Sequence, residues 1–187
     1  VAVLPQALDE VLQRFANVDA ISECTVLSTC NRSEIYCVTQ DVLVAREAVI
    51  EGLCIQSGLD ADALRGHLFV HQDGEAVRHL FGVASGLDSM VMGEPQIAGQ
   101  VKDAGAAALA AGTSKTVLNR LFRAATEASK RARTETQIAA GAVSISFAAV
   151  ELAKKILGKL EGQTALVIGA GEMSELTARH LADNGVK

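Results

Sequence analysis

An apolar run that ends at two closely spaced glycines leaves this chain of 187 residues few folds to choose from. The run is Thr164-Ala165-Leu166-Val167-Ile168. Gly169-Ala170-Gly171-Glu172-Met173-Ser174 follows, and then a helical pattern to Asn184. A continuous apolar run of this length is typical of a strand buried on both faces. Glycines between such a strand and a helix let the backbone approach a pyrophosphate at the helix N-terminus. The segment therefore predicts the opening of a dinucleotide-binding domain.

This glycine motif is incomplete. Ser174 stands where a third Gly or Ala usually lies, and the sequence reaches Lys187 before the position that reads the cofactor ribose. A tight turn in some other α/β fold therefore stays open as an alternative.

A second distinctive stretch, Ser28-Thr29-Cys30-Asn31-Arg32, lies between two strand-like runs, 25–27 and 34–38. A thiol that ends a strand two residues from a guanidinium is well placed to have a lowered pKa. The alternative is a buried structural thiol. The remaining cysteines are interpreted as small buried hydrophobes, and they are Cys24, Cys37 and Cys54. Because no pair has CxxC spacing and no histidine lies nearby in sequence, no zinc site is expected. A disulfide framework is not expected either in a chain of this size whose start does not resemble a signal peptide.

Apolar residues at helical spacing predict most of the remaining structure. Helices are expected over 4–15, 42–56, 60–64, 74–84, 96–111, 114–133 and 143–157, with a short buried strand at 68–70, loop chemistry over 85–100 and a hinge over 136–141. Asp60 and Ser114 are suited to be N-caps, and Gly58 is suited to end a helix. Strands and helices in this order predict an α+β sandwich, with helices on one face of a mainly antiparallel sheet that is one strand short.

The charge pattern excludes some partners and suggests another. A formal net charge of -5 gives no overall attraction to nucleic acid, so such binding needs a local patch. The helix expected over 114–133 offers one, because only Glu127 opposes six basic residues: Lys115, Arg120, Arg123, Lys130, Arg131 and Arg133. It is either a solvated helix face or a surface that contacts phosphates. No apolar run approaches the roughly 20 residues that span a bilayer. The start at Val1 suggests a truncation rather than a signal peptide, so a cytoplasmic location with reduced thiols is expected.

Five segments together resemble the glutamyl-tRNA reductase family, in the order in which that family has them. They are 28–34 (STCNRSE), 79–81 (HLF), 86–102 (GLDSMVMGEPQIAGQVK), 131–136 (RARTET) and 169–172 (GAGE). The resemblance implies an α/β chain with a catalytic, tRNA-binding α+β domain over 1–142. The start of an NADPH-binding Rossmann domain follows over 143–187. Family segments before Val1, most of the NADPH domain and the dimerisation domain would be missing, so these residues alone are not expected to transfer hydride.

The resemblance also implies the reaction and the partners. The family reduces the glutamyl group on tRNA(Glu) to glutamate-1-semialdehyde with NADPH, through a cysteine thioester, in the first step of five-carbon tetrapyrrole (porphyrin) biosynthesis. Expected partners are glutamyl-tRNA(Glu), glutamate-1-semialdehyde aminomutase and a second copy of the whole protein. Two rivals fit the same residues: an aldehyde dehydrogenase that forms a thioester with a small molecule, and a non-catalytic dinucleotide-binding module.

The resemblance assigns roles to single residues. Cys30 matches the nucleophile and His79 the group that assists proton transfer, with His71 as a nearby competitor and a half-buried helical residue as the alternative for His79. Arg32 suits bidentate binding of the substrate carboxylate. The other substrate-binding positions are Thr29, Asn31, Ser89, Glu94, Pro95, Gln96 and Gln100. The cofactor-binding positions are Gly169, Ala170, Gly171, Glu172, Met173 and Ser174. No metal is expected.

Overall fold

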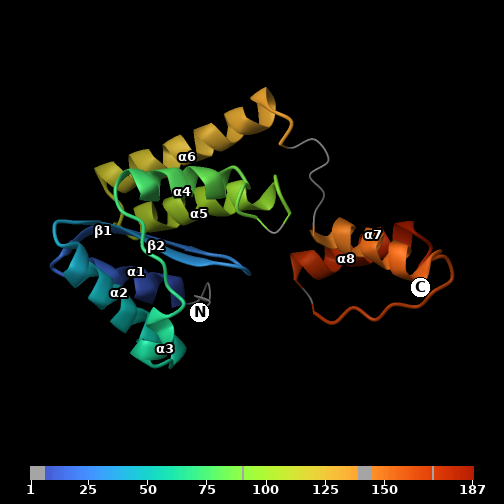
Figure 1. Cartoon of the computed structure of the whole chain (residues 1–187), viewed down its shortest axis with the longest axis horizontal. Helices are drawn as coiled ribbons and strands as arrows, with labels where there is room; N and C mark the ends of the chain where they lie inside the picture. Colours follow the sequence, from blue (N-terminus) through green and yellow to red (C-terminus); the bar gives the residue numbers. More distant parts are fainter. Residues whose placement is uncertain (1–6, 90, 139–144, 170) are drawn as a thin grey trace.

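A computed structural model of the chain describes residues 7–89, 91–138, 145–169 and 171–187. Its elements in chain order are α1 (Leu8–Ala16), β1 (Ile21–Ser28), β2 (Ser33–Thr39), α2 (Val42–Ser57), α3 (Ala61–Arg65), α4 (Gly74–Ala84), α5 (Gln96–Ala110), α6 (Thr116–Glu135), α7 (Ile145–Leu157) and α8 (Glu172–Asp183) (Figure 1). Within these residues, no helix is long and apolar enough to cross a membrane.

The strands β1 and β2 form an antiparallel pair, and their alternating side chains face two different layers of helices. Leu27 and Tyr36 lie in one core with residues of α4, α5 and α6. Cys24 and Val26 lie in another core with α1 and Ala45 of α2. Figure 1 shows the two helical layers on opposite sides of the sheet. The α+β class and the antiparallel sheet are therefore confirmed, but helices cover both faces of the sheet, not one. The physical reason is that each face of this short hairpin contributes apolar side chains that need to be buried.

The outer edge of β1 is covered by the connection between α5 and α6. The Cys24 backbone N–H donates to the Thr113 carbonyl at 2.9 Å, and the Thr113 hydroxyl donates to the Cys24 carbonyl at 3.1 Å. Because an unpaired strand edge leaves polar backbone groups to be satisfied, these bonds replace part of a third strand. This contact also fixes the point at which α6 starts beside β1.

A buried carboxylate in β1 caps α6. Glu23 is 6% exposed, and its side-chain oxygens accept hydrogen bonds from the backbone N–H groups of Lys115 (2.9 Å), Val117 (3.0 Å) and Leu118 (2.8 Å). These are the groups that a helix leaves unpaired at its N-terminus, where the helix dipole also favours a negative charge. Burial by itself raises the pKa of Glu23, but the three backbone donors outweigh it and hold the pKa below its usual value.

The expected cap at Ser114 is therefore not observed. The Ser114 hydroxyl bonds to the Asn119 side chain at 2.9 Å, and no side chain of the adjoining residues caps α6. A carboxylate 92 to 95 positions away in the sequence takes the place of the local cap. The other expected caps are confirmed. The Asp60 carboxylate accepts from two N–H groups of α3, and Gly58 ends α2 with a φ of +69°.

Two expected strands differ in the structure. Residues 68–70 form no strand, and Phe69 and Val70 are exposed. Residues 164–168 are also outside any strand, with Leu166 and Ile168 exposed. This segment meets the end of the chain through three backbone bonds: the Gly162 N–H donates to the Gly185 carbonyl (2.9 Å), the Lys187 N–H to the Gln163 carbonyl (2.8 Å) and the Ala165 N–H to the Lys187 carbonyl (3.0 Å), the last two as in a parallel pair. An apolar strand buried on both faces needs neighbours on both sides, and among the described residues these bonds supply a neighbour on one side. Residues 1–6 and 139–144 of the expected first helix, hinge and seventh helix lie outside the described residues.

We predict that Glu23→Gln lowers the free energy of unfolding by about 1–3 kcal/mol at neutral pH, because three backbone donors lose a charged acceptor. Since folding lowers the pKa of Glu23, its stabilising charge is fully present above the unfolded value of about 4.3 and is lost as the pH falls through the folded value. Urea unfolding of both proteins from neutral to acidic pH measures this difference. The exposed Glu51→Gln is the matched control and should change stability little. A constant difference between wild type and Glu23→Gln down to strongly acidic pH contradicts the assignment.

Candidate functional site

The turn between β1 and β2 presents the thiol of Cys30 to solvent. The Thr29 hydroxyl accepts from the backbone N–H groups of Asn31 and Arg32, each at 3.2 Å, and the Thr29 N–H donates to the Arg32 carbonyl at 2.8 Å. These three bonds close the turn on itself, so its backbone does not depend on the Cys30 side chain. Cys30 and Asn31 are both exposed at its tip. A rigid turn with an accessible thiol is suited to nucleophilic chemistry.

The other three cysteines are placed differently. Cys24 is fully buried and its thiol lies 3.4 Å from the Leu12 carbonyl. Burial raises the pKa of the Cys24 thiol, and it raises the pKa of Cys37 to about 12. Cys54 is half-buried. Because the thiolate is the nucleophilic form, burial disfavours reaction at Cys24 and Cys37, and Cys30 is the exposed thiol.

Glu34 of β2 is the centre of an ionisable cluster behind this turn. Its side chain is 9% exposed, and its two oxygens take three partners. Oε1 accepts from Arg32 Nη1 at 2.9 Å and lies 3.0 Å from His79 Nε2, while Oε2 accepts from the Tyr36 hydroxyl at 2.5 Å. A buried carboxylate is costly unless it is paired, and these donors satisfy it. Glu34 therefore joins β2, the thiol turn and α4.

His79 is held by acidic groups and not by the thiol. It is 17% exposed, and its Nδ1 lies 3.8 Å from an oxygen of Asp88, on the side opposite the Glu34 contact. Among the described residues, no hydrogen bond joins His79 to Cys30. The ring of the competing residue His71 lies 5.0 Å from the ring of His79. His79 is therefore a half-buried helical residue within an ionisable cluster, and its expected part in proton transfer stays a prediction.

Arg32 ties the turn to the segment between α4 and α5. Besides its bond to Glu34, it donates from Nη2 to the Asp88 carbonyl at 2.5 Å. Both terminal nitrogens of the guanidinium thus already donate to groups of the protein. The expected role of Arg32 in reading a substrate carboxylate therefore stays a prediction.

The segment from Ser85 to Pro95 is closed by two glycines. The Gly93 N–H donates to the Gly86 carbonyl at 3.0 Å, and both glycines have positive φ, +79° and +76°. A Cβ on Gly86 would come within 3.0 Å of the Gly93 Cα, so no larger residue fits there. Arg133 of α6 donates from Nη2 to the Gly93 carbonyl at 2.8 Å. Arginines from the turn and from α6 therefore hold the segment at its two ends.

The predicted substrate-binding positions in and beside this closed segment differ in their exposure to solvent. Ser89, Glu94 and Gln96 are half-buried, whereas Pro95 and Gln100 are exposed at the start of α5 and one turn further on. Asp88 brings Ser89 next to Arg32. The amide of Gln96 lies 3.5 Å from the sulfur of Met173, which links this segment to the predicted cofactor turn.

The glycine turn before α8 is the predicted place for a cofactor pyrophosphate. Gly169 has a φ of +127°, and a Cβ there would lie 3.0 Å from the Ser174 hydroxyl. Gly171 is the N-cap of α8 and offers no side chain to cap it, while the Ser174 N–H donates to the Gly171 carbonyl at 3.0 Å. These features fit a nucleotide phosphate. Ala170 lies outside the described residues, as does the side chain of Glu172.

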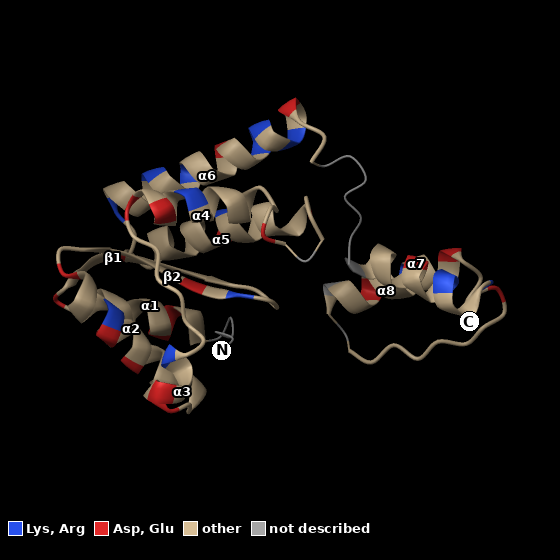
Figure 2. Cartoon of the chain, viewed as in Figure 1, with Lys and Arg blue, Asp and Glu red and all other residues tan. Residues whose placement is uncertain are grey.

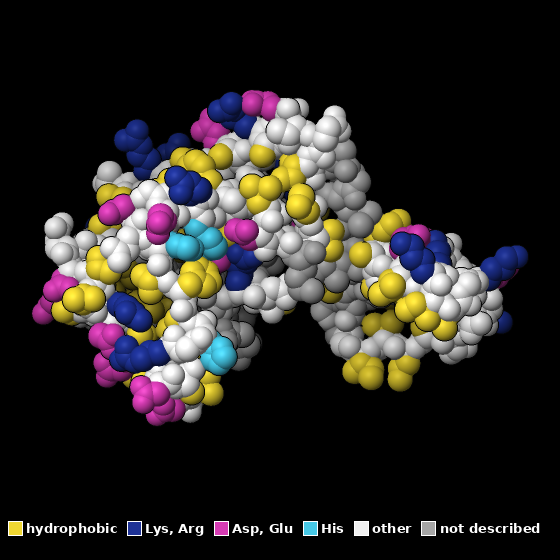
Figure 3. Space-filling model, in the orientation of Figure 1, with side chains coloured by type: hydrophobic (Ala, Val, Ile, Leu, Met, Phe, Trp, Pro, Cys, Tyr) yellow, Lys and Arg dark blue, Asp and Glu magenta, His cyan; other side chains and the backbone are white. Residues whose placement is uncertain are grey.

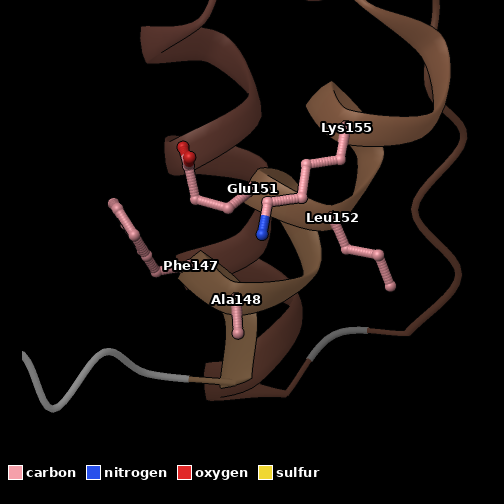
Figure 4. A pocket seen from close by; sticks show the side chains of 5 residues that line it. All are labelled: Phe147, Ala148, Glu151, Leu152 and Lys155. Carbon is pink, nitrogen blue, oxygen red and sulfur yellow. The ribbon is translucent and has the colours of Figure 1, made fainter.

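One hollow lies outside this site, on α7. A hollow of about 470 Å³ is lined by five residues of one helix, α7, so it has a single wall: Phe147, Ala148, Glu151, Leu152 and Lys155 (Figure 4). Within the described parts of the chain, no three His, Cys, Asp or Glu side chains are grouped so that they could hold a metal ion.

Fold and site together define a class of protein in which an α+β domain with an accessible thiol precedes a glycine turn of the dinucleotide-binding kind. The family model "Glutamyl-tRNAGlu reductase, N-terminal domain" matches residues 1–136, and "Shikimate / quinate 5-dehydrogenase" matches 151–187. The chain therefore belongs to the glutamyl-tRNA reductase family.

Full-length relatives agree. Glutamyl-tRNA reductase of Geobacter metallireducens is 46% identical over all 187 residues, and that of Pseudomonas fluorescens is 50% identical. The chain spans 43% and 44% of these two proteins. A solved structure of glutamyl-tRNA reductase from Methanopyrus kandleri aligns with a TM-score of 0.63 at 43% identity, covering 96% of this chain and 42% of that one.

Sequence reasoning gave no role to three residues that the structure places in the cluster, Glu34, Tyr36 and Asp88, and it placed Arg133 only on the basic face of its helix. The sequence does indicate that Glu34 and Tyr36 lie together, because residues two apart in a strand point to the same face of the sheet. Nothing in the sequence indicates that Arg133 reaches Gly93, since 40 positions separate them.

Tyr36 is the only tyrosine of a chain that has no tryptophan, so its ultraviolet absorbance reports on this cluster directly. Burial raises the pKa of Tyr36, and the Glu34 charge raises it further. We predict that the wild-type tyrosine stays protonated well past its ordinary pKa of about 10 and ionises only when alkali unfolds the chain.

In Glu34→Gln the Tyr36 pKa should fall toward its ordinary value without reaching it, since burial persists. Alkaline absorbance titration, with circular dichroism to follow unfolding, measures both proteins, and the exposed Glu51→Gln is the control. Identical titration curves for wild type and Glu34→Gln contradict the cluster.

Proposed function

We propose that the whole protein reduces the glutamyl group of glutamyl-tRNA(Glu) to glutamate-1-semialdehyde, as the first step of tetrapyrrole biosynthesis. Membership of the family supports this reaction. The observation that carries the proposal is the exposed thiol of Cys30 on a turn closed by its own hydrogen bonds. That thiol is accessible to an ester at the end of a large nucleic acid, whereas Cys24 and Cys37 are not.

In the proposed reaction, the Cys30 thiolate attacks the carbonyl carbon of the glutamyl ester. A sulfur–carbon bond forms, the ester bond to the ribose oxygen breaks, and the leaving hydroxyl of the tRNA takes up a proton. The glutamyl group then remains on Cys30 as a thioester. We assign the substrate contacts to Thr29, Asn31 and Arg32 of the turn, and to Ser89, Glu94, Pro95, Gln96 and Gln100 of the neighbouring segment.

We assign the proton transfer to His79. An imidazole exchanges protons near neutral pH, and the contact between its Nε2 and Glu34 holds the ring in one orientation. An ionised carboxylate can only accept, so Glu34 keeps a proton on this nitrogen. Glu34 is thus a positioning residue that acts through His79 and Arg32.

We further propose that residues 1–142 form the catalytic domain and that residues 143–187 begin a domain for NADPH. Gly169, Gly171 and the N-terminus of α8 would hold the pyrophosphate, with Ala170, Glu172, Met173 and Ser174 completing the turn. When bound, this cofactor supplies the hydride that releases the acyl group as an aldehyde. The dehydrogenase family model over 151–187 supports a nicotinamide cofactor.

The proposed partners follow from the product and from the family. The aldehyde product is reactive, so direct transfer to glutamate-1-semialdehyde aminomutase would protect it. We also propose that the whole protein is a homodimer in the cytoplasm.

We propose that tRNA(Glu) binds along α6. Lys and Arg follow this helix (Figure 2), and Arg120, Arg123 and Lys130 are exposed on it. Arg131 pairs with Glu135 at 2.9 Å and Arg133 holds Gly93, so these two are less available.

Cys30→Ser in the whole protein should lower reductase activity at least about a thousandfold, because a serine hydroxyl is a far weaker nucleophile at neutral pH. Incubation with tRNA that carries labelled glutamate, without NADPH, should leave label on the wild-type protein as a hydroxylamine-sensitive thioester. The half-buried Cys54→Ser is the matched control and should label normally. Full activity of Cys30→Ser excludes it as the nucleophile, and equal turnover of a small glutamyl ester without tRNA points to the small-molecule alternative.

Arg123→Gln should weaken tRNA binding and reduce the slope of log K against log salt by about one, if the residue contacts one phosphate. Binding measured at several salt concentrations gives this slope. Arg46→Gln on α2 removes the same charge from the opposite side of the sheet and should leave the slope unchanged. An unchanged slope in Arg123→Gln favours the solvated-face alternative for α6.

A further inference from the structure

Three rings form an open cluster beside His79. The ring centroids of Phe69 and His71 are 5.1 Å apart, those of Phe69 and His79 are 5.4 Å apart, and those of His71 and His79 are 5.0 Å apart. Phe69 is 64% exposed and the His71 side chain 39% exposed. Figure 3 shows histidine side chains lying open on this face of the molecule, beside hydrophobic ones.

The cluster lies where the strand expected over 68–70 fails to form. Phe69 and His71 come from the segment between α3 and α4, whereas His79 lies inside α4. The backbone of this segment turns into α4 at Asp73, which has a φ of +48° although it is not glycine. Phe69 is therefore exposed on a connection with a constrained backbone, and its ring packs against the rings of His71 and His79.

The cluster is continuous with the proposed site. His79 contacts the rings on one side and Glu34 on the other, and Glu34 binds Arg32 of the thiol turn. A substrate with its ester at Cys30 therefore has a path along Arg32, Glu34 and His79 to the rings. The side chains of His67 and Arg78, close by in the sequence, are exposed, and carboxylates contact the two imidazoles: Glu75 lies 3.8 Å from His71, and Glu34 and Asp88 lie 3.0 and 3.8 Å from His79.

We propose that Phe69, supported by His71 and His79, stacks with the terminal nucleobase of the acylated RNA. This inference rests on the proposed function and adds a subsite to it. Aromatic faces next to basic side chains are the usual means of holding an unpaired base. Stacking at this place fixes the ribose that carries the ester, so binding energy from the base positions the reacting carbonyl at Cys30.

The test is a double-mutant cycle between Phe69 and the terminal base, in the whole protein. Binding is measured for an RNA minihelix with an intact 3′ end and for the same RNA with an abasic 3′-terminal nucleotide. Phe69→Ala should weaken binding of the intact RNA about tenfold, the typical worth of one stacked base. Removal of the base should weaken wild-type binding to a similar extent but should hardly affect Phe69→Ala. Phe69→Trp should restore the wild-type pattern.

Two controls separate loss of this subsite from other effects. Phe147→Ala removes a half-exposed phenylalanine from α7 and should leave both affinities unchanged. Thioester formation on Cys30 at saturating intact glutamyl-tRNA should persist in Phe69→Ala, so failure of this subsite is distinguishable from failure of the proposed reaction. The proposal is overturned if base removal weakens wild type and Phe69→Ala by the same factor, or if it weakens neither, as expected for a surface that binds protein.

Discussion

The carboxylate of Glu34 is the interaction on which the arrangement of the site depends. One side chain, 9% exposed, joins the thiol turn through Arg32, α4 through His79 and the core through Tyr36. The Tyr36 ring in turn meets Phe122 of α6 edge-on, with centroids 5.3 Å apart. Removal of a single partner would leave a buried charge less satisfied, which is costly, so these four groups form a unit and not a set of separate contacts.

A second carboxylate on the same face of the hairpin has a different task. Glu23 lies toward the other end of β1 and ends in the N-terminus of α6, among backbone donors only. Glu34 instead contacts three side chains, those of Arg32, Tyr36 and His79. In this hairpin, Glu23 fixes the start of α6, and Glu34 orients Arg32 and His79 behind the thiol.

The thiol itself stands apart from this network. Cys30 lies at the tip of a turn whose own backbone bonds define it, while the ionisable groups and the rings lie behind and beside it. This arrangement leaves the thiol accessible from solvent, with several other groups close enough to contact a molecule that approaches it.

Local sequence rules predicted much of the fold. Apolar periodicity located the helices from α2 to α6, Asp60 and Gly58 marked helix ends, and the thiol turn stood between two apolar runs. These features depend on residues a few positions apart, which the chain specifies before it folds. The motifs also indicated the family, because a motif is recognised from residue types and their spacing along the chain and not from contacts in the fold.

Only the tertiary structure decided how these parts meet. It replaced the expected Ser114 cap with Glu23, placed helices on both faces of the sheet, and set Glu34 between Arg32 and His79. It also left Phe69 outside, where its apolar run predicted a buried strand. Each of these outcomes joins residues tens of positions apart or depends on whether a strand finds a partner. Periodicity along one segment carries no information about that, because burial and pairing are properties of the folded neighbourhood.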